Sequence, residues 1–184
     1  MLIEISGEVD ARLTKAARSL SEGYDKVIER LLDHWENKSS NGNARSSESG
    51  LLRFRPSDPP SLAFTSCDRI LIDDSQLPRG ETNWNRMLYA MARYLHVEKG
   101  LSGKDIISML TIVNGEVGRI TDRGYRYIPE ADISIQGKDS DSTYRQIYQL
   151  SLLANVPFEI SFHWRSNEGA AHPGQRGIIS FSGP

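Results

Sequence analysis

The sequence predicts an α+β fold divided into an N-terminal module, a linker and a larger C-terminal domain. Three observations support this division. One strand-like and two helix-like patterns fill residues 1–37, a run rich in Ser, Asn, Gly and Pro fills residues 38–61, and strand-like and helix-like patterns alternate over residues 62–184. With 184 residues, 38% of them hydrophobic and 25% charged, the chain has an ordinary globular composition.

The N-terminal module begins with a strand-like run at residues 2–6, in which alternate isoleucines share one face. Two helix-like segments follow, with apolar residues three and four positions apart. One strand and two helices in so short a segment cannot bury a stable core alone, so we expect two copies to pair through their strands in a ribbon–helix–helix-like dimer. The residues expected at that dimer interface are Ile3, Ile5, Leu13, Ile28, Leu31 and Leu32.

The outward face of the predicted strand carries Leu2, Glu4 and Ser6. A strand that reads DNA presents basic or amide side chains to the major groove, and phosphate would repel Glu4. Residues 1–37 as a whole are acidic, with eight carboxylates against five basic side chains. We therefore assign this module to self-association rather than DNA contact. An unrelated helical hairpin is the alternative.

The segment 38–61, KSSNGNARSSESGLLRFRPSDPPS, has almost no apolar periodicity. Its composition predicts a flexible linker, because so few apolar side chains cannot offset the entropy lost when the chain is ordered. Only Leu51, Leu52 and Phe54 are apolar enough to dock locally. The linker would separate the dimerisation module at residues 1–37 from a domain at residues 62–184.

The C-terminal domain alternates element types, which predicts a mixed helix and sheet domain with a small sheet covered by helices. Thr82 or Asn83 caps a helix that runs to Lys99, and Ser102 caps a shorter helix. Pro129 within a strand-like run indicates an edge strand or a bulge. The expected elements are strands at 68–74, 125–136, 157–164 and 178–181 and helices ending at Lys99, spanning 104–110 and opening at Ser140 or Ser142.

Properties of the whole chain exclude several classes of protein. No apolar run approaches the ~20 residues of a membrane helix, and the first residues lack the pattern of a secretory signal. The single cysteine, Cys67, cannot form an internal disulfide. We therefore expect a cytoplasmic protein with no membrane partner. Because the net charge is −2, any surface that binds nucleic acid must be local.

The strongest functional candidate is the segment 119–138. Arg119, Arg123 and Arg126 lie within eight residues, and Gln136 and Lys138 follow just before a predicted helix. Cationic side chains on loops beside a helix N-terminus suit phosphate oxygens, because side chains and free backbone N–H groups both donate there. A glutamine at this place can bond an adenine through N6 and N7. The alternative is a solvated surface whose arginines pair with neighbouring carboxylates.

Four further stretches of the sequence stand out: IEIS, GYDKVIERLL, NRMLYAMARYL and ISIQGKDSDSTYRQIYQLS. Together they resemble the SeqA family of bacterial negative modulators of replication initiation. The resemblance implies self-association through the N-terminal module and binding of double-stranded DNA through two loops, one near Arg119 and one near Gln136 and Lys138. It is not extended to the methylated target of that family, because the asparagines of the second loop are absent here.

Two other classes of function stay open. Magnesium-dependent nucleases combine an acid on one strand with Gln-x-Lys on the next, and Gln136-Gly137-Lys138 matches the second part, with Asp122, Glu130 or Asp132 as the acid. A protein–protein adaptor is the other class, because residues 63–184 are nearly neutral. Our prediction is a DNA-binding protein without catalytic residues, metal or cofactor. It would act as a homodimer or higher oligomer that modulates replication or transcription.

Overall fold

The computed structural model describes residues 50–183 of the chain. The chain divides into two compact units, Met1–Asn43 and Ala44–Pro184, and the described residues belong to the second unit. The predicted dimerisation module lies outside the described residues, and so does the first half of the predicted linker. The interface residues expected there are Ile3, Ile5, Leu13, Ile28, Leu31 and Leu32.

The described residues contain both helices and strands, which confirms the α+β class for this part of the chain. The strands are β1 (Leu51–Phe54), β2 (Thr65–Ile72), β3 (Ser75–Gln76), β4 (Gly115–Val117), β5 (Tyr125–Ile128), β6 (Ile133–Gln136), β7 (Phe158–Trp164) and β8 (Arg176–Phe181). The α-helices are α3 (Trp84–Val97), α4 (Gly103–Ser108) and α5 (Ser140–Ala154), and η1 (Arg79–Glu81) is a single 3-10 turn. Within residues 50–183, no helix is long and apolar enough to cross a membrane.

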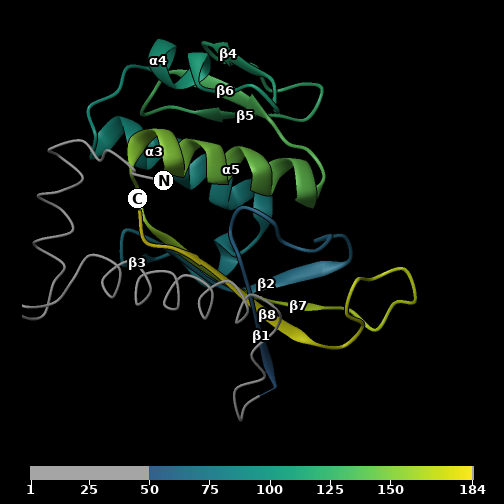
Figure 1. Ribbon diagram of the computed structural model, residues 1–184. Helices are drawn as coiled ribbons and strands as arrows, with labels where there is room; N and C mark the ends of the chain where they lie inside the picture. The colour runs from purple at the N-terminus through teal and green to yellow at the C-terminus, as the bar shows by residue number, and fades with distance from the viewer. Residues whose placement is uncertain (1–49, 184) are drawn as a thin grey trace, which may run out of the picture. The chain divides into compact units, whose positions relative to one another are not determined.

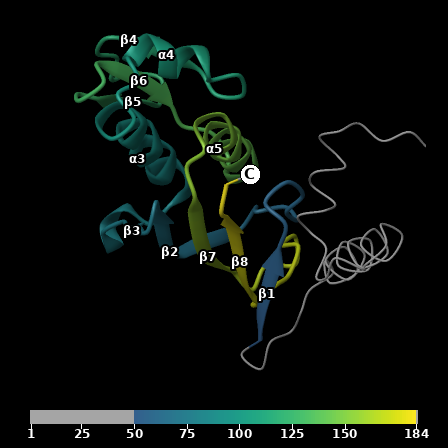
Figure 2. The same ribbon diagram turned by 60° about the vertical axis from the view of Figure 1, so that its left-hand side comes forward.

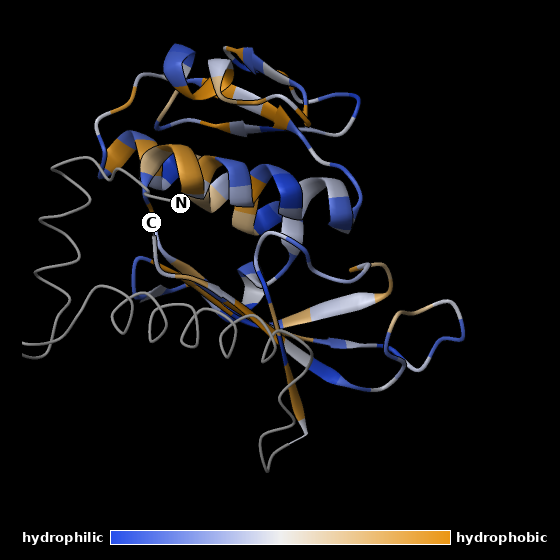
Figure 3. Ribbon diagram, viewed as in Figure 1, coloured by the Kyte–Doolittle hydropathy of each residue, from blue (hydrophilic) through white to orange (hydrophobic). Residues whose placement is uncertain are grey.

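These elements form three layers (Figure 1, Figure 2). One layer is a five-stranded sheet of order β1-β8-β7-β2-β3, and another is a three-stranded sheet of order β4-β6-β5. Helices α3 and α5 lie between the two sheets, and α4 lies beside the smaller one (Figure 1). The helix layer must therefore bury side chains on two sides, and it carries apolar and polar positions in close succession (Figure 3).

The five-stranded sheet is centred on β7, whose side chains alternate strictly between buried and half-buried. Phe158, Ile160, Phe162 and Trp164 are at most 3% exposed and face the core. This confirms the prediction made from their period of two. Strand β7 pairs antiparallel with both β2 and β8, so that Ile160 stands opposite Ile70 and Ile179.

The prediction of a flexible linker over residues 38–61 is wrong for its second half. Strand β1 pairs parallel with β8, and its Leu52 and Phe54 pack against the core. Farther along, the Tyr144 hydroxyl donates to the Pro56 carbonyl at 2.7 Å. The composition misled because an edge strand needs little apolar surface of its own when β8 supplies its backbone partners. The folded domain therefore begins at β1 and not at residue 62.

The helix starts follow the predicted caps. The Asn83 side chain accepts a bond from the Arg86 N–H at 2.9 Å, which confirms the cap of α3. Ser102 and Asp105 form a reciprocal capping box at the start of α4. Helix α5 begins at Ser140, which is one of the two starts predicted for it, and Asp139 is its capping residue. Short-range hydrogen bonds thus fix where each helix of the described chain begins.

Helix α3 contacts β2 of the larger sheet and β5 of the smaller sheet. Its first turn is tied to the larger sheet by the Trp84 indole N–H, which donates to Thr65 Oγ1 at 2.9 Å. Its last turn is tied there by the Tyr94 hydroxyl, which donates to the Asp73 carboxylate. The residues that α3 buries point to several sides of the helix and are Trp84, Met87, Leu88, Ala90, Met91, Ala92 and Leu95. Polar side chains are therefore restricted to one edge of α3.

The single strand predicted at 125–136 is instead a hairpin of β5 and β6. The turn between them is closed by a bond from the Asp132 N–H to the Pro129 carbonyl, and Asp132 has a left-handed φ of 49°. Pro129 marks the turn itself rather than an edge or a bulge, because its fixed φ suits a turn and it has no N–H to give to a ladder. Strand β6 is central and pairs with both β4 and β5.

A buried glutamine holds the chain between α4 and β4. Gln146 of α5 is fully buried, and its Oε1 accepts bonds from the N–H groups of Thr111 and Ile112 at 3.0 and 2.9 Å. Its Nε2 donates to the Met109 carbonyl at 3.2 Å. Backbone groups in this irregular segment thus find partners that no strand or helix offers them.

Replacing Gln146 with Met should lower the free energy of unfolding by about 2–3 kcal/mol, because the part-buried N–H groups of Thr111 and Ile112 would lose their acceptor. Urea denaturation of the full chain measures the change. The matched control is Arg145→Met on the exposed side of the same helix, which should shift stability by less than about 0.5 kcal/mol. Equal stability of the two variants would contradict the role given to Gln146.

Candidate nucleic-acid interface

The predicted site residues face two directions, because they alternate along the strands of the smaller sheet. Tyr127 stands opposite Ser134, whereas Arg126 stands opposite Ile135. Directly opposed residues share a face of the sheet, and Ile135 is fully buried in the core. Arg126 therefore lies on the side of the helix layer, and Tyr127 lies on the outer side.

Arg119 lies on the outer side of the smaller sheet. Its guanidinium carbon is 5.8 Å from the centre of the Tyr127 ring, within the range of a cation–π contact. The loop that carries it is held by the Ser134 hydroxyl, which donates to the Gly118 carbonyl at 2.7 Å and accepts from the Ile120 N–H at 2.8 Å. These contacts position Arg119 while leaving its side chain exposed.

Gln136 serves the fold rather than an outside partner in this structure. Its Oε1 accepts from the Asn114 side-chain amide at 2.8 Å, and its Nε2 donates to the Arg123 carbonyl at 2.8 Å. Gln136 thus ties together the loops before β4 and before β5. The predicted bond to an adenine would have to compete with both internal bonds, so we regard Gln136 as a positioning residue.

Arg123 and Lys138 are both exposed cations near the Gln136 end of the sheet. Arg123 Nε lies 3.6 Å from Asp122 Oδ2, with both side chains more than two-thirds exposed. Such a pair is screened by water and contributes little to stability. Lys138 Nζ donates to the Ile112 carbonyl at 2.7 Å, which uses one of its three N–H donors. Both charges remain accessible to an anion.

Arg126 lies in a cleft between β5 and α3, together with Arg86 and Arg93 of the helix. The cleft has a volume of about 180 Å³, and two carboxylates also line it. Arg93 lies 4.0 Å from one of these, Glu130, between their charged atoms. Arg86 and Arg126 form no ion pair with any carboxylate of residues 50–183. We refer to this site as the arginine cleft.

Tyr89 lies in the wall of the arginine cleft. Burial raises the pKa of its phenol above the ordinary value of 10.0, and the nearby charges of Arg126 and Arg86 lower it in part. Both arginines line the same cleft as Tyr89. A Cβ added at Gly137 would lie only 3.0 Å from that oxygen, so the chain passes the tyrosine closely at a glycine.

Sequence reasoning found Arg126 but not its companions in the cleft. Arg86, Tyr89 and Arg93 stand at positions i, i+3 and i+7, which places them on one stripe of α3. This spacing can be recognised in the sequence, but the prediction for this helix considered only its apolar side. What the sequence did not show was that this stripe meets Arg126 of β5.

The residues proposed for a nuclease are divided between the two ends of β6. Asp132 lies in the turn at the far end of β6 from Gln136 and accepts a bond from the Tyr127 hydroxyl at 2.9 Å. Asp122 lies at the near end, exposed beside Arg123. Residues 50–183 contain no group of three or more His, Cys, Asp or Glu side chains placed to hold a metal ion.

Cys67 is not placed as a nucleophile. Burial raises the pKa of its thiol to about 12, with a further contribution from the charge of Asp68. A thiol with so high a pKa stays protonated at neutral pH, and the thiolate is the reactive form. Cys67 packs against the core as a half-buried residue of β2.

Comparison with known proteins gives no relative for this chain. No protein-family model, no curated protein and no solved structure matches it. The SeqA-like architecture therefore stays a prediction, and the function has to be argued from the residues themselves.

The arginine cleft predicts a change in the titration of Tyr89. Replacing Arg126 with Gln should raise the pKa of Tyr89 further, because the phenolate would lose a nearby positive charge that favours it. Titration of ¹³C-labelled tyrosines by NMR measures this, with Tyr89→Phe to assign the signal and Arg145→Gln as the control. An unchanged or lower pKa in Arg126→Gln would place Arg126 away from the phenol.

Proposed function

We propose that this protein binds double-stranded DNA without catalysing a reaction on it, and that the arginine cleft and its surroundings hold the phosphate backbone. One observation supports the proposal above the others. Three arginines from two different elements line one cleft with a half-buried tyrosine, and two of them form no ion pair with a described carboxylate. Guanidinium groups bind phosphate oxygens with two parallel hydrogen bonds, so such a cluster suits a phosphodiester chain.

The residues have different parts in this proposal. Arg86 and Arg126 bind phosphate directly, because neither forms an ion pair with a carboxylate of the described chain. Arg93 is partly neutralised by Glu130 and adds less. Arg119, Arg123 and Lys138 extend the contact along the exposed side of the smaller sheet, where each keeps a free donor. Gln136 keeps the two loops at this end of the sheet in place.

The second part of the proposal concerns self-association. A domain whose charge is nearly neutral overall gains affinity for DNA when two copies are joined, because the second contact is then made at high effective concentration. Residues 1–37 supply the pattern expected of a dimerisation module. A homodimer of this kind suits a modulator of replication or transcription, as the resemblance to the SeqA family implies.

The double variant Arg86→Gln, Arg126→Gln should bind a 30-base-pair duplex roughly 10- to 100-fold more weakly than the natural chain. The slope of log K against log salt should fall by about 2, because each lost phosphate contact removes about 0.9 from it. Fluorescence anisotropy at several salt concentrations measures both quantities.

The matched control for this experiment is Arg145→Gln, an exposed arginine on α5 outside the cleft. It should leave affinity and salt slope nearly unchanged. Equal affinity of the double variant and the natural chain would remove the cleft from the interface. Cleavage of plasmid by the natural chain with Mg²⁺, lost in Lys138→Ala, would favour the nuclease instead.

The dimer is tested separately by Leu31→Asp in the full chain. A buried carboxylate at the proposed interface should dissociate the dimer, because its desolvation is not repaid by any partner. Sedimentation velocity should then show a monomer, and binding to a long duplex should weaken. Glu29→Asp keeps the charge of the same segment and serves as the control. A natural chain that sediments as a monomer would contradict self-association.

A further inference from the structure

The five-stranded sheet has an outer face that points away from the helix layer (Figure 1, Figure 2). Successive side chains of a strand point to opposite faces of the sheet. Phe54, Phe162 and Ile179 pack into the core on the inner face, so the residues next to them along each strand point to the outer face. We call it the outer sheet face. Its members are Leu51, Arg53, Ser66, Asp68, Arg69, Leu71, Glu159, Ser161, His163, Arg176, Ile178 and Ser180.

The charge of the outer sheet face is positive. It carries Arg53, Arg69 and Arg176, and Arg165 lies directly beyond the end of β7. Arg53 and Arg176 are exposed and form no ion pair with a carboxylate of the described chain. Four guanidinium groups thus stand against two carboxylates on and beside this face.

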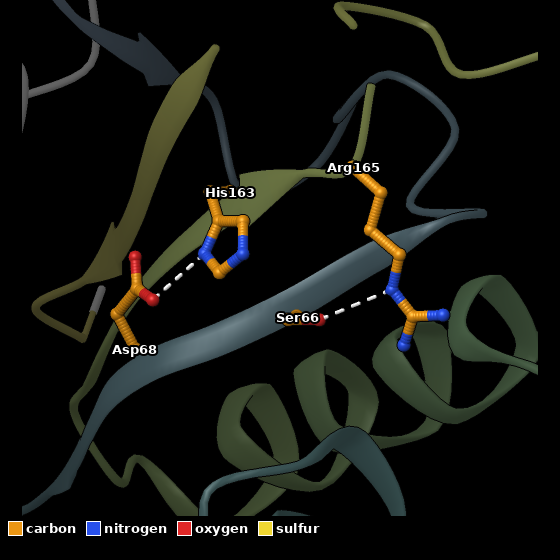
Figure 4. Close-up of polar contacts among 4 residues, drawn as sticks. All are labelled: Ser66, Asp68, His163 and Arg165. Atoms are coloured by element: carbon orange, nitrogen blue, oxygen red, sulfur yellow. Dashed lines mark hydrogen bonds and ion pairs between the residues drawn. The ribbon is translucent and has the colours of Figure 1, made fainter. Parts of the chain in front are cut away.

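Both carboxylates of the outer sheet face already have partners. Glu159 lies 3.7 Å from Arg69, between their charged atoms. Asp68 is the extra residue of a β-bulge in β2, and its carboxylate lies 2.8 Å from His163 Nδ1 (Figure 4). The bulge turns this acid along the sheet toward the histidine rather than leaving it open to an incoming anion. Repulsion of a phosphate chain by these two acids is therefore reduced.

Arg165 is also held in place on this side of the sheet. Its Nε donates to the Ser66 hydroxyl at 3.4 Å, and the rest of its guanidinium extends beyond the strand (Figure 4). Because Ser66 stands opposite His163, the bonded pairs Asp68–His163 and Arg165–Ser66 lie close together on two adjacent strands. The remaining donors of Arg165 are free for an oxygen ligand.

Two of these four arginines, Arg53 and Arg69, stand at the ends of one row of paired residues that crosses four strands. Arg53 of β1 stands opposite Ile178 of β8, which stands opposite Ser161 of β7, which stands opposite Arg69 of β2. Three strand spacings of about 4.8 Å put the two arginine backbones about 14 Å apart. That separation is close to the roughly 12 Å width of the major groove of B-DNA. Between them lie the uncharged Ser161 and Ile178, of which Ile178 is 6% exposed.

We propose that the outer sheet face binds the phosphate backbone of a second DNA duplex. This inference rests on the proposed function and extends it, because the same domain would then hold two duplexes. The arginine cleft lies beyond the helix layer from this face (Figure 1). A straight duplex on the sheet therefore does not reach the cleft, and each chain bridges two DNA segments through opposite sides of its described domain.

The number of duplexes bound per chain tests this inference. Sedimentation of the full chain with a saturating, labelled 12-base-pair duplex should give two duplexes per chain, whatever the oligomeric state. The variant Arg53→Ser, Arg176→Ser should bind one, as should Arg86→Gln, Arg126→Gln. The control Arg145→Gln should bind two, and far-ultraviolet circular dichroism should show that each variant is folded.

The outcomes separate this inference from the proposed function. The role of the outer sheet face would be overturned if the variant Arg53→Ser, Arg176→Ser still bound two duplexes per chain. It would also be overturned if the natural chain bound one duplex and this variant bound it with the same affinity. If that variant lost one duplex while Arg86→Gln, Arg126→Gln lost none, the outer sheet face would be supported as a DNA-binding surface. The arginine cleft would then be excluded as one. A natural chain that binds no duplex would overturn both.

Discussion

The position of α3 between two sheets is the constraint on which the rest of the described domain depends. A helix that packs on both sides can carry charge only along a narrow edge, and here that edge holds Arg86, Tyr89 and Arg93. Hydrogen bonds at Trp84 and Tyr94 tie both ends of the helix to the larger sheet, so its rotation is fixed. The smaller sheet then brings Arg126 to the same edge. The cluster of arginines thus follows from the packing of the core.

A junction at Asn85 connects this edge to the loop that follows β6. Its Oδ1 accepts from the Lys138 N–H at 3.1 Å and from the Thr143 hydroxyl at 3.0 Å, and its Nδ2 donates to the Lys138 carbonyl at 3.0 Å. One amide therefore joins α3, the loop and α5. Gly137 permits the approach, because a side chain there would press on Asn85 and Tyr89. Cations on the helix and on the loop are held at a fixed separation as a result.

The features that the sequence predicted correctly are those set by short-range physics. Asn83 and Ser102 cap their helices through bonds three residues away, and the period of two in β7 follows from its own side chains. The features missed depend on partners far along the chain. Strand β1 exists because β8 lies beside it, and the arginine cleft exists because β5 meets α3. The same limit applies to Gln136, whose residue type suggested a base contact while its place in the fold gives its amide two internal bonds.

Strand β1 has a mechanical consequence for a chain with modules on both sides of residue 50. It is an edge strand of four residues, and it runs parallel to β8. A pull that acts along the axis of β1 loads its ladder of bonds to β8 in shear, so that these bonds share the force. Leu52 and Phe54, anchored in the core, resist the sliding that such a load would cause. A pull along β1 is therefore transmitted through β8 to the rest of the described domain.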